Sequence, residues 1–504
     1  MNNYFNLIDE PWIPVANHNR VSLAEIFSNP TLKSISGNAL HKVSLLKILL
    51  AIAQRAFTPE NDEQWLALES SGLAKKCLEY LEDKKDLFWL YGDKPFLQKA
   101  DLATTKTLKG EPIPLSILGK DYPPDLPLDN ESILFESQQN QELTDAEKAV
   151  LIVSMMNYSL AGKRVAKDVP PWSKEYTGKT SSAKGGPSIG NYHGYQNSHL
   201  VGQSLIDTIW LNLLTRKQLN LFPQWENDPL IPPWEEFPEG EDDAIAKRLK
   251  GSFMSTLCAV SRFLLLKDNG ILYVEGLQYP SHKEGWREPF MTYGSGPEGR
   301  IVWNDPAVKP WRNLPALLST AFHGTDAKFN SPQIGLLILR SRQARDVVGI
   351  WAGGLKVRGT AGDMSVKQSD DFIDSITFFR TKDLGGEWFN SFENEMLGLE
   401  DTEYQLKRAI KGYYKSLSSI NPSALPKATA LFWELCSRKI QQLVDVCDNP
   451  PEMDSLRKEF IGYAYQAYNI YCPNQTARQM SAWARNSPSF YRRGVERKEV
   501  SFVK

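Results

Sequence analysis

A segment rich in glycine and lysine, between Ala161 and Gly190, carries the most chemically suggestive residues of the chain. Six Lys or Arg side chains lie in it, against only Asp168 and Glu175. Its glycines and serines allow backbone amides to approach a phosphate or a nucleic-acid groove closely. The segment therefore predicts contact with nucleic acid, and a solvated loop is the alternative explanation.

Two glycine-containing motifs suggest nucleotide binding but are incomplete. Residues 176–180 end like a phosphate-binding P-loop, yet Ser173 stands where that motif needs its first glycine, and no apolar strand precedes it. Residues 294–299 match G-x-G-x-x-G, but the helix that this fingerprint must open would contain Pro297. Residues 300–303 are strand-like instead, so the second motif predicts the tip of a hairpin.

Metal-dependent chemistry needs clustered ligands, and the six histidines show no H-D, H-x-H or H-E-x-x-H pairing. His193 and His199 lie six residues apart in a Gly/Asn-rich loop, which is weak evidence for a ligand pair. The five cysteines are dispersed without a C-x-x-C pair, as is typical of reduced thiols. The sequence therefore predicts neither a metal site nor a cofactor.

Two further basic groups lie near the C-terminus. Lysines recur at four-residue spacing at positions Lys407, Lys411 and Lys415, with Arg408 beside them. The second group is an arginine cluster that includes Arg478, Arg485, Arg492 and Arg493. Charged helix faces are usually only solvated, but two on one small domain favour nucleic acid. Such a basic face is suited to holding a displaced single strand.

Composition limits how such surfaces are arranged. The formal net charge is −2 over 504 residues, so any nucleic-acid surface must be local, because a stand-alone DNA-binding protein usually has a basic balance. A hydrophobic content of 41% is typical of a globular protein with ample core material. The N-terminus lacks a signal-peptide pattern, and the apolar stretch 45–53 is interrupted by Lys47. These features predict a cytoplasmic protein without membrane contact.

The elements that must position these residues fall into two parts. Residues 1–380 mix helical and strand-like patterns with many Gly and Pro interruptions, which predicts an irregular α+β domain rather than a βαβ series. We expect a hairpin over 4–21 that turns at 17–19, followed by a helix over 43–57. A capping box at 144–147 predicts the start of another helix. Farther along, we expect a helix over 243–265 that leads to a hairpin turning at 268–270, and then a β-rich stretch over 336–348.

The second part, residues 381–504, has a different pattern. Apolar residues recur there at alternating three- and four-residue steps, and prolines at 422–426, 450–451 and 473 interrupt these stripes. Four helical segments with short connections predict a four-helix bundle.

Four patches resemble one known family. Residues 7–15, Leu-Ile-Asp-Glu-Pro-Trp-Ile-Pro-Val, resemble the opening of the large subunit of the type I-E CRISPR Cascade complex, the CasA family. Residues 88–98, 311–318 and 351–354 match further patches in the family's order. The resemblance covers most of the chain. It implies a non-catalytic protein with a large α+β domain followed by a four-helix bundle, in agreement with the two parts above.

The resemblance also implies a function and partners. The family's subunit sits at one end of a crRNA-guided complex, where it recognises the protospacer-adjacent motif (PAM) of duplex DNA. It then promotes strand separation into an R-loop and helps recruit a helicase–nuclease. The expected partners are crRNA, target double-stranded DNA, the guide-backbone, handle-binding and small subunits, and the helicase–nuclease.

Site residues are implied at matching positions. The loop that reaches the guide handle is expected to carry Phe135, and the loop along the PAM minor groove corresponds to Gly178, Lys179, Thr180 and Lys184. The candidates for a hairpin lysine of the family are Lys283, Arg287 and Arg300. The strand-separating wedge aligns with Gly359 and Thr360, where the family typically has a glutamine, so Lys356 or Arg358 are alternatives.

Two other functions remain open at this point. A metal-dependent DNA-processing enzyme would need a hydrolytic site, and a scaffold subunit would only dock other members of the complex.

Overall fold

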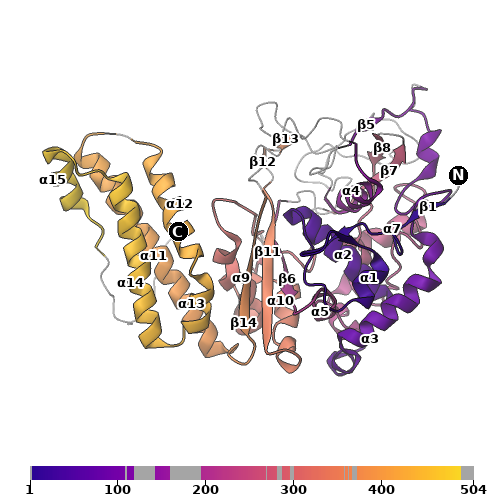
Figure 1. Cartoon of the computed structure of the whole chain (residues 1–504), viewed down its shortest axis with the longest axis horizontal. Coiled ribbons are helices and arrows are strands. Elements are labelled where there is room, and N and C mark those ends of the chain that lie inside the picture. Colours follow the sequence, from indigo (N-terminus) through magenta and orange to yellow (C-terminus); the bar gives the residue numbers. More distant parts are fainter. Residues whose placement is uncertain are drawn as a thin grey trace. The chain divides into compact units, whose positions relative to one another are not determined.

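The computed structural model describes residues 3–107, 110–118, 142–158, 194–267, 270–280, 287–295, 300–356, 358–360, 363–365, 372–419 and 421–489. The chain forms two compact units, Met1–Lys382 (unit 1) and Asp383–Lys504 (unit 2). Unit 1 combines helices with several small sheets, and the described part of unit 2 is helical (Figure 1). The predicted α+β fold class is therefore confirmed.

Unit 1 is organised around the apolar helix α2 (Ala39–Ala56), close to the predicted range. The helix begins at Asn38, whose side chain accepts a hydrogen bond from the His41 backbone N–H. Most of its residues are buried, because it packs against other helices and a sheet. The other helices of this unit are α1 (Leu23–Ser28), α3 (Asp62–Asp83), α4 (Asp145–Tyr158), α5 (Leu205–Leu211), α6 (Arg216–Leu219), α7 (Ala244–Gly251), α8 (Met254–Leu257), α9 (Leu314–His323) and α10 (Pro332–Leu337).

Two three-stranded antiparallel sheets stabilise this unit. The first has the order β14 (Phe372–Arg380), β11 (Val347–Leu355), β6 (Asn197–Val201), and α2 packs on it. The second has the order β5 (Ser116–Ile117), β8 (Gly270–Glu275), β7 (Arg262–Lys267). Among the described residues there are also four strand pairs: β1 (Tyr4–Asn6) with β4 (Trp89–Tyr91), β2 (Ile13–Pro14) with β3 (Arg20–Val21), β9 (Tyr293–Gly294) with β10 (Phe329–Asn330), and β12 (Arg358–Thr360) with β13 (Asp363–Ser365).

The N-terminal hairpin is shorter than predicted. Only β2 and β3 form it, with Asn17 at a positive φ of 65° in the turn. Strand β1 pairs instead with β4, far along the chain. The prediction over 4–21 was wrong in its first part because local turn signals cannot identify a distant strand partner. The capping box is confirmed, since Thr144 Oγ1 accepts from the Glu147 N–H and Glu147 Oε2 from the Thr144 N–H.

The β-rich prediction over 336–348 was wrong in most of its length. Helix α10 and a 3₁₀ turn (Arg340–Gln343) occupy it, and β11 begins only at Val347. Trp65 and Trp210 stack face to face with ring centroids 4.1 Å apart. The guanidinium of Arg340 lies 3.9 Å from the Trp65 ring, and that of Arg345 lies 4.7 Å from the Trp210 ring. These tertiary contacts override the local β-propensity.

The helix predicted over 243–265 is also shorter. Asp243 accepts from the Ala246 N–H at the start of α7, which ends at Gly251, and the short α8 follows. Arg262 already belongs to strand β7, so the predicted hairpin β7–β8 is confirmed.

Unit 2 contains the helices α11 (Gly386–Ser416), α12 (Ala424–Ser437), α13 (Ile440–Val446), α14 (Pro450–Tyr471) and α15 (Ala477–Asn486). Helix α12 packs on α14, and α11 contacts α12, α14 and α15. The second predicted helical segment is thus divided into α12 and α13. The four-helix bundle stays a prediction.

Two features concern the whole chain. All five cysteines are buried thiols that form no disulfide. No helix among the described residues has the length and apolarity that crossing a membrane requires.

Candidate nucleic-acid interface

Part of the predicted site lies outside the described residues. These positions are Phe135, Gly178, Lys179, Thr180, Lys184, Lys283, Arg492 and Arg493. The backbone of the other predicted residues is described, and they fall on a layer and a short hairpin of unit 1 and on two helices of unit 2.

A small buried cluster forms the base of the unit 1 layer. Tyr195, Met291 and Ile301 pack together, with Tyr293 against them. Antiparallel bridges join the same segments: Tyr195 pairs with Trp303, and Tyr293 pairs with Ile301. Three stretches that are separate in the sequence therefore form one connected layer.

Arg287 and Arg300 are both attached to this layer. The Arg287 guanidinium lies 4.8 Å from the centre of the Tyr293 ring, a cation–π contact that fixes its position. Arg300 is exposed, and its carbonyl oxygen accepts the Gly294 N–H at 2.7 Å. Gly294 lies in strand β9, as the hairpin interpretation of residues 294–299 expected. The structure thus brings these two predicted cations onto one surface element.

Lys356 reaches the same layer from the end of β11. Its Nζ forms an ion pair with Asp305 Oδ1 at 2.7 Å, so it is not a free wedge residue. The Gly353–Gly354 pair before it lies within the central strand of the sheet. A Cβ on Gly353 would lie 2.6 Å from the Ile373 carbonyl oxygen, so only glycine allows this close strand pairing.

The proposed wedge residues form a separate element. Arg358, Gly359 and Thr360 make up β12, which pairs antiparallel with β13. Figure 1 shows this short hairpin beyond the end of the long strands β11 and β14. The wedge positions predicted from the sequence therefore lie on a small hairpin next to the layer that carries Lys356.

A buried ion pair lies directly behind Arg287. Lys47 Nζ on α2 contacts Glu288 Oε2 at 2.9 Å, and neither side chain is more than 2% exposed. The Lys47 ammonium also lies over the rings of Phe290 (5.3 Å) and Tyr158 (5.8 Å). Burial raises the pKa of Glu288. The pair fixes the Arg287 segment to the core helix, and sequence reasoning missed it because only tertiary structure joins the two residues.

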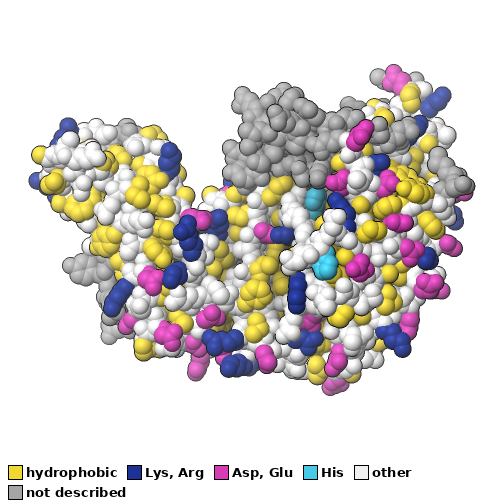
Figure 2. All heavy atoms as spheres, in the orientation of Figure 1, with side chains coloured by type: hydrophobic (Ala, Val, Ile, Leu, Met, Phe, Trp, Pro, Cys, Tyr) yellow, Lys and Arg dark blue, Asp and Glu magenta, His cyan; other side chains and the backbone are white. Residues whose placement is uncertain are grey.

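The surface charges match the nearly neutral composition. On the face that Figure 2 shows, Lys and Arg side chains are interspersed with Asp and Glu.

In unit 2, some of the predicted cations contact other residues of the chain and others are simply exposed. Lys407 is ion-paired with Glu403 at 2.8 Å, and Arg478 donates to the Leu417 carbonyl oxygen at 2.6 Å. Both side chains are therefore held by other residues of unit 2, and their role at nucleic acid stays a prediction. Lys411, Lys415 and Arg485 are exposed. Helix α15, which carries Arg485, packs on α11 through Asn486, whose Nδ2 donates to Ser416 Oγ at 3.0 Å.

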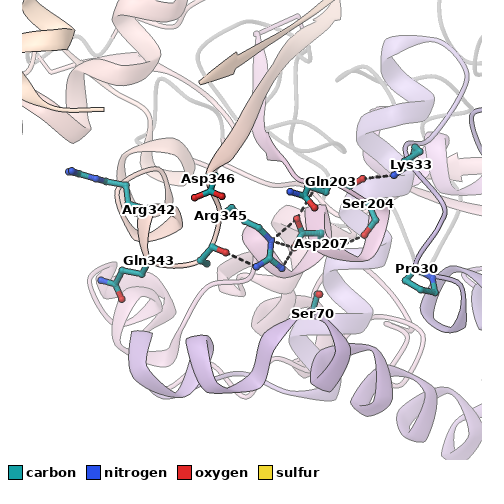
Figure 3. Close-up of a pocket in the computed structure, with 11 residues that line it drawn as sticks. Pro30, Lys33, Ser70, Gln203, Ser204, Asp207, Arg342, Gln343, Arg345 and Asp346 are labelled. Carbon is teal, nitrogen blue, oxygen red and sulfur yellow. Dashed lines mark hydrogen bonds and ion pairs between the residues drawn. The ribbon is translucent and has the colours of Figure 1, made fainter. Parts of the chain in front are cut away.

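A polar hollow of about 570 Å³ lies beside α5 (Figure 3). Its lining includes Lys33, Ser70, Gln203, Asp207, Arg342 and Arg345. The Arg345 side chain points to Asp207, with Nε 2.9 Å from Oδ1, and Asp207 Oδ2 also accepts the Gln203 N–H. Because these two charges neutralise each other, the pair serves to fix the turn before β11 to α5.

Within the described ranges, no group of three or more His, Cys, Asp or Glu is placed to hold a metal ion.

Comparison with known families decides the identity. The family model for CRISPR-associated protein Cse1 matches residues 6–467. The chain belongs to the Cse1 family. Its predicted resemblance to CasA is thereby confirmed, because CasA and Cse1 name the same protein in the relatives below.

Known members of the Cse1 family are similar to this chain in sequence or in fold. CasA/Cse1 of Thermus thermophilus is 28% identical over 237 residues, which span 45% of this chain and only 43% of that protein. Cse1 of Thermobifida fusca has a TM-score of 0.68 at 19% identity, covering 96% of this chain and 97% of that one. A chain from a CRISPR RNA-guided surveillance complex has a TM-score of 0.67 at 15% identity, covering 96% and 99%. These structures show a shared fold.

The opening motif of this Cse1 family member has a structural role. Trp12 is fully buried, and its indole Nε1 donates to the Leu7 carbonyl oxygen at 3.0 Å. The Asn6 side chain accepts the Ile8 N–H at 2.9 Å. The motif that resembles the family most clearly therefore contributes to the packing of unit 1.

Proposed function

We propose that the chain is the non-catalytic large subunit of a cytoplasmic crRNA-guided surveillance complex, in which it recognises the PAM of double-stranded DNA. Family membership supports this proposal, as does the fold shared with a chain of a CRISPR RNA-guided surveillance complex. The observation that carries it is the layer in unit 1. Arg287, Arg300 and Lys356, all expected at the DNA, belong to connected segments.

The layer is suited to a short and degenerate DNA motif. Cations attached to small hairpins contact phosphates and the edge of a groove, which positions a duplex. The minor groove mainly distinguishes A·T from G·C, and the remaining sequence is recognised by guide pairing. We extend the same surface to Gly178, Lys179, Thr180, Lys184 and Lys283, and assign Phe135 to the guide handle.

Later steps of the proposal involve the other elements. The hairpin β12–β13 separates the first base pair, with Arg358 or the Gly359–Thr360 tip as the wedge. Unit 2, as a four-helix bundle, holds the displaced strand so that the R-loop stays open. The assembled complex then recruits its helicase–nuclease, with crRNA and the other Cascade subunits as partners.

The test uses this chain added to guide-loaded complex that lacks the large subunit, with a PAM-containing duplex as the probe. The double variant Arg287→Ala/Arg300→Ala should weaken binding and reduce the salt slope of log K by roughly 2, about one counterion per lost phosphate contact. Arg342→Ala, an exposed arginine of the polar hollow, is the matched control. An unchanged salt slope in the double variant would contradict the proposal.

The same preparation separates the two alternatives. Cleavage of the duplex by the purified chain with Mg²⁺ or Mn²⁺ would indicate an enzyme. Binding that does not change with salt would indicate a scaffold that only docks other subunits.

A further inference from the structure

One face of helix α11 is exposed along much of its length. Steps of three or four residues place Leu397, Asp401, Tyr404, Arg408, Lys411 and Lys415 on it. All six are exposed, with Tyr404 62% and Leu397 56% accessible. The core side of the helix is supplied by other residues, such as Leu406, Ile410 and Tyr413. The packing of unit 2 therefore does not depend on the residues of this face.

The charges on α11 are separated along the helix. Acidic residues occur up to Glu403, and from Tyr404 to Ser416 the helix carries cations without an acid. In the part of the chain that the structure describes, no ion pair involves Arg408, Lys411 or Lys415, whereas the neighbouring Lys407 is paired with Glu403. The helix dipole favours cations only within the last turn. The dipole therefore explains a cation at Lys415 but not one at Arg408, and it gives no reason for the exposed ring of Tyr404.

We propose that Tyr404, Arg408, Lys411 and Lys415 form a binding site for single-stranded DNA, in which one base stacks on the Tyr404 ring and the phosphates contact the three cations. An exposed aromatic ring followed by cations on one face is the arrangement that binds single strands without sequence preference. The site extends about 16 Å along the helix, which is enough for a few nucleotides. Helix α15, which packs on α11, carries a further exposed cation, Arg485.

This site deepens the proposed function and rests on it, because the proposed function supplies the strand. That strand is the one displaced during R-loop formation. Stacking on Tyr404 adds what the cations alone do not, because a stacked base holds the strand in one place along the helix.

The experiment measures fluorescence anisotropy of labelled oligo-dT, and of an abasic oligonucleotide of the same length, with the full chain. Tyr404→Ala should weaken oligo-dT binding roughly 5- to 100-fold, the range expected for one stacked base, and leave abasic binding unchanged. Tyr404→Phe should bind oligo-dT like the unchanged chain. Lys411→Glu/Lys415→Glu should weaken both probes.

Leu397→Ala is the matched control, an exposed apolar residue two turns away among acids. Since Tyr404 and Leu397 are both exposed, neither change should alter the melting temperature. The proposal is overturned if Tyr404→Ala leaves oligo-dT binding unchanged, if it weakens both probes equally, or if Leu397→Ala has the same effect. Its failure is distinct from failure of PAM recognition, which the Arg287/Arg300 variant reports on duplex DNA.

Discussion

At the scale of single residues, His199 shows how an isolated histidine is used in the core. It lies in β6, 6% exposed, with its ring stacked on Trp351 at 4.9 Å. Burial, together with the charge of Lys42, lowers the pKa of His199 to about 3. Trp351 Nε1 donates to Asp374, the carboxylate that also pairs with Lys42. The imidazole is therefore a neutral packing group, as the absence of a ligand pattern in the sequence suggested.

A dependence of stability on pH follows. A histidine in the unfolded chain titrates near pH 6.5, so below that pH the unfolded state binds a proton that the folded state does not. The contribution of His199 to the free energy of unfolding is thus complete above about pH 6.5. Between about pH 6.5 and pH 3, this contribution should fall by about 1.4 kcal/mol for each pH unit that the pH is lowered. Urea unfolding at a series of pH values measures this slope. His199→Phe, which keeps a ring against Trp351, should reduce it, and an unchanged slope in this variant would contradict the prediction.

At the scale of elements, the Lys47–Glu288 pair joins the core helix α2 to the segment that carries Arg287. Removing two charges from water costs several kcal/mol, which their attraction offsets only while both are present. The pair thus connects two elements, and we expect the loss of either partner alone to destabilise the fold.

We expect Glu288→Leu to lower the free energy of unfolding by about 3–5 kcal/mol, because it leaves the Lys47 ammonium buried without a counter-charge. The double variant Lys47→Met/Glu288→Leu should be less destabilised than the single one. The exposed pair Lys76–Glu79 is the control, and its removal should cost less than about 1 kcal/mol. Additive losses in the Lys47/Glu288 double-mutant cycle, measured by denaturant unfolding, would show that the two charges do not act together.

Elements with local signals could be predicted from the sequence, and elements with distant partners could not. Helix α2 and the capping box at Thr144 follow from apolar spacing and side-chain caps. Strand β1 pairs with a strand some 85 residues away, and the turn at Arg340 depends on a tryptophan stack from other helices. The candidate site shows the same division: the family resemblance implied Arg287, Arg300 and Lys356, but their connection through Tyr195, Met291 and Ile301 could not be seen in the sequence.

At the scale of the whole molecule, basic residues occur in both units of a chain that is almost neutral. The sequence shows where these groups lie along the chain but could not separate exposed from held cations. Lys407 and Arg478 form contacts within unit 2, and Lys411, Lys415 and Arg485 remain exposed. Under the proposed function, unit 1 contacts the duplex and unit 2 contacts the displaced strand.

Charge reversal in unit 2 tests this division of roles. The triple variant Lys411→Glu/Lys415→Glu/Arg485→Glu, assembled with guide-loaded complex, should bind the PAM duplex nearly normally but give a lower yield of R-loop, measured by permanganate reactivity of the displaced strand. On a target with a pre-opened bubble the defect should become smaller, because re-annealing no longer competes. Equal defects on closed and bubbled targets would indicate that unit 2 acts by docking other subunits.

The five buried cysteines have a practical consequence for following these steps. Burial raises the pKa of the thiols of Cys77, Cys258, Cys447 and Cys472, for the last two to about 12, and Cys436 is buried as well. Thiolates are the species that react with maleimides, so we expect the native chain to react slowly with such dyes. A single cysteine introduced at an exposed position such as Leu397 would therefore accept a fluorophore selectively. The wild-type background is already suited to single-molecule energy-transfer measurements without removing any natural residue.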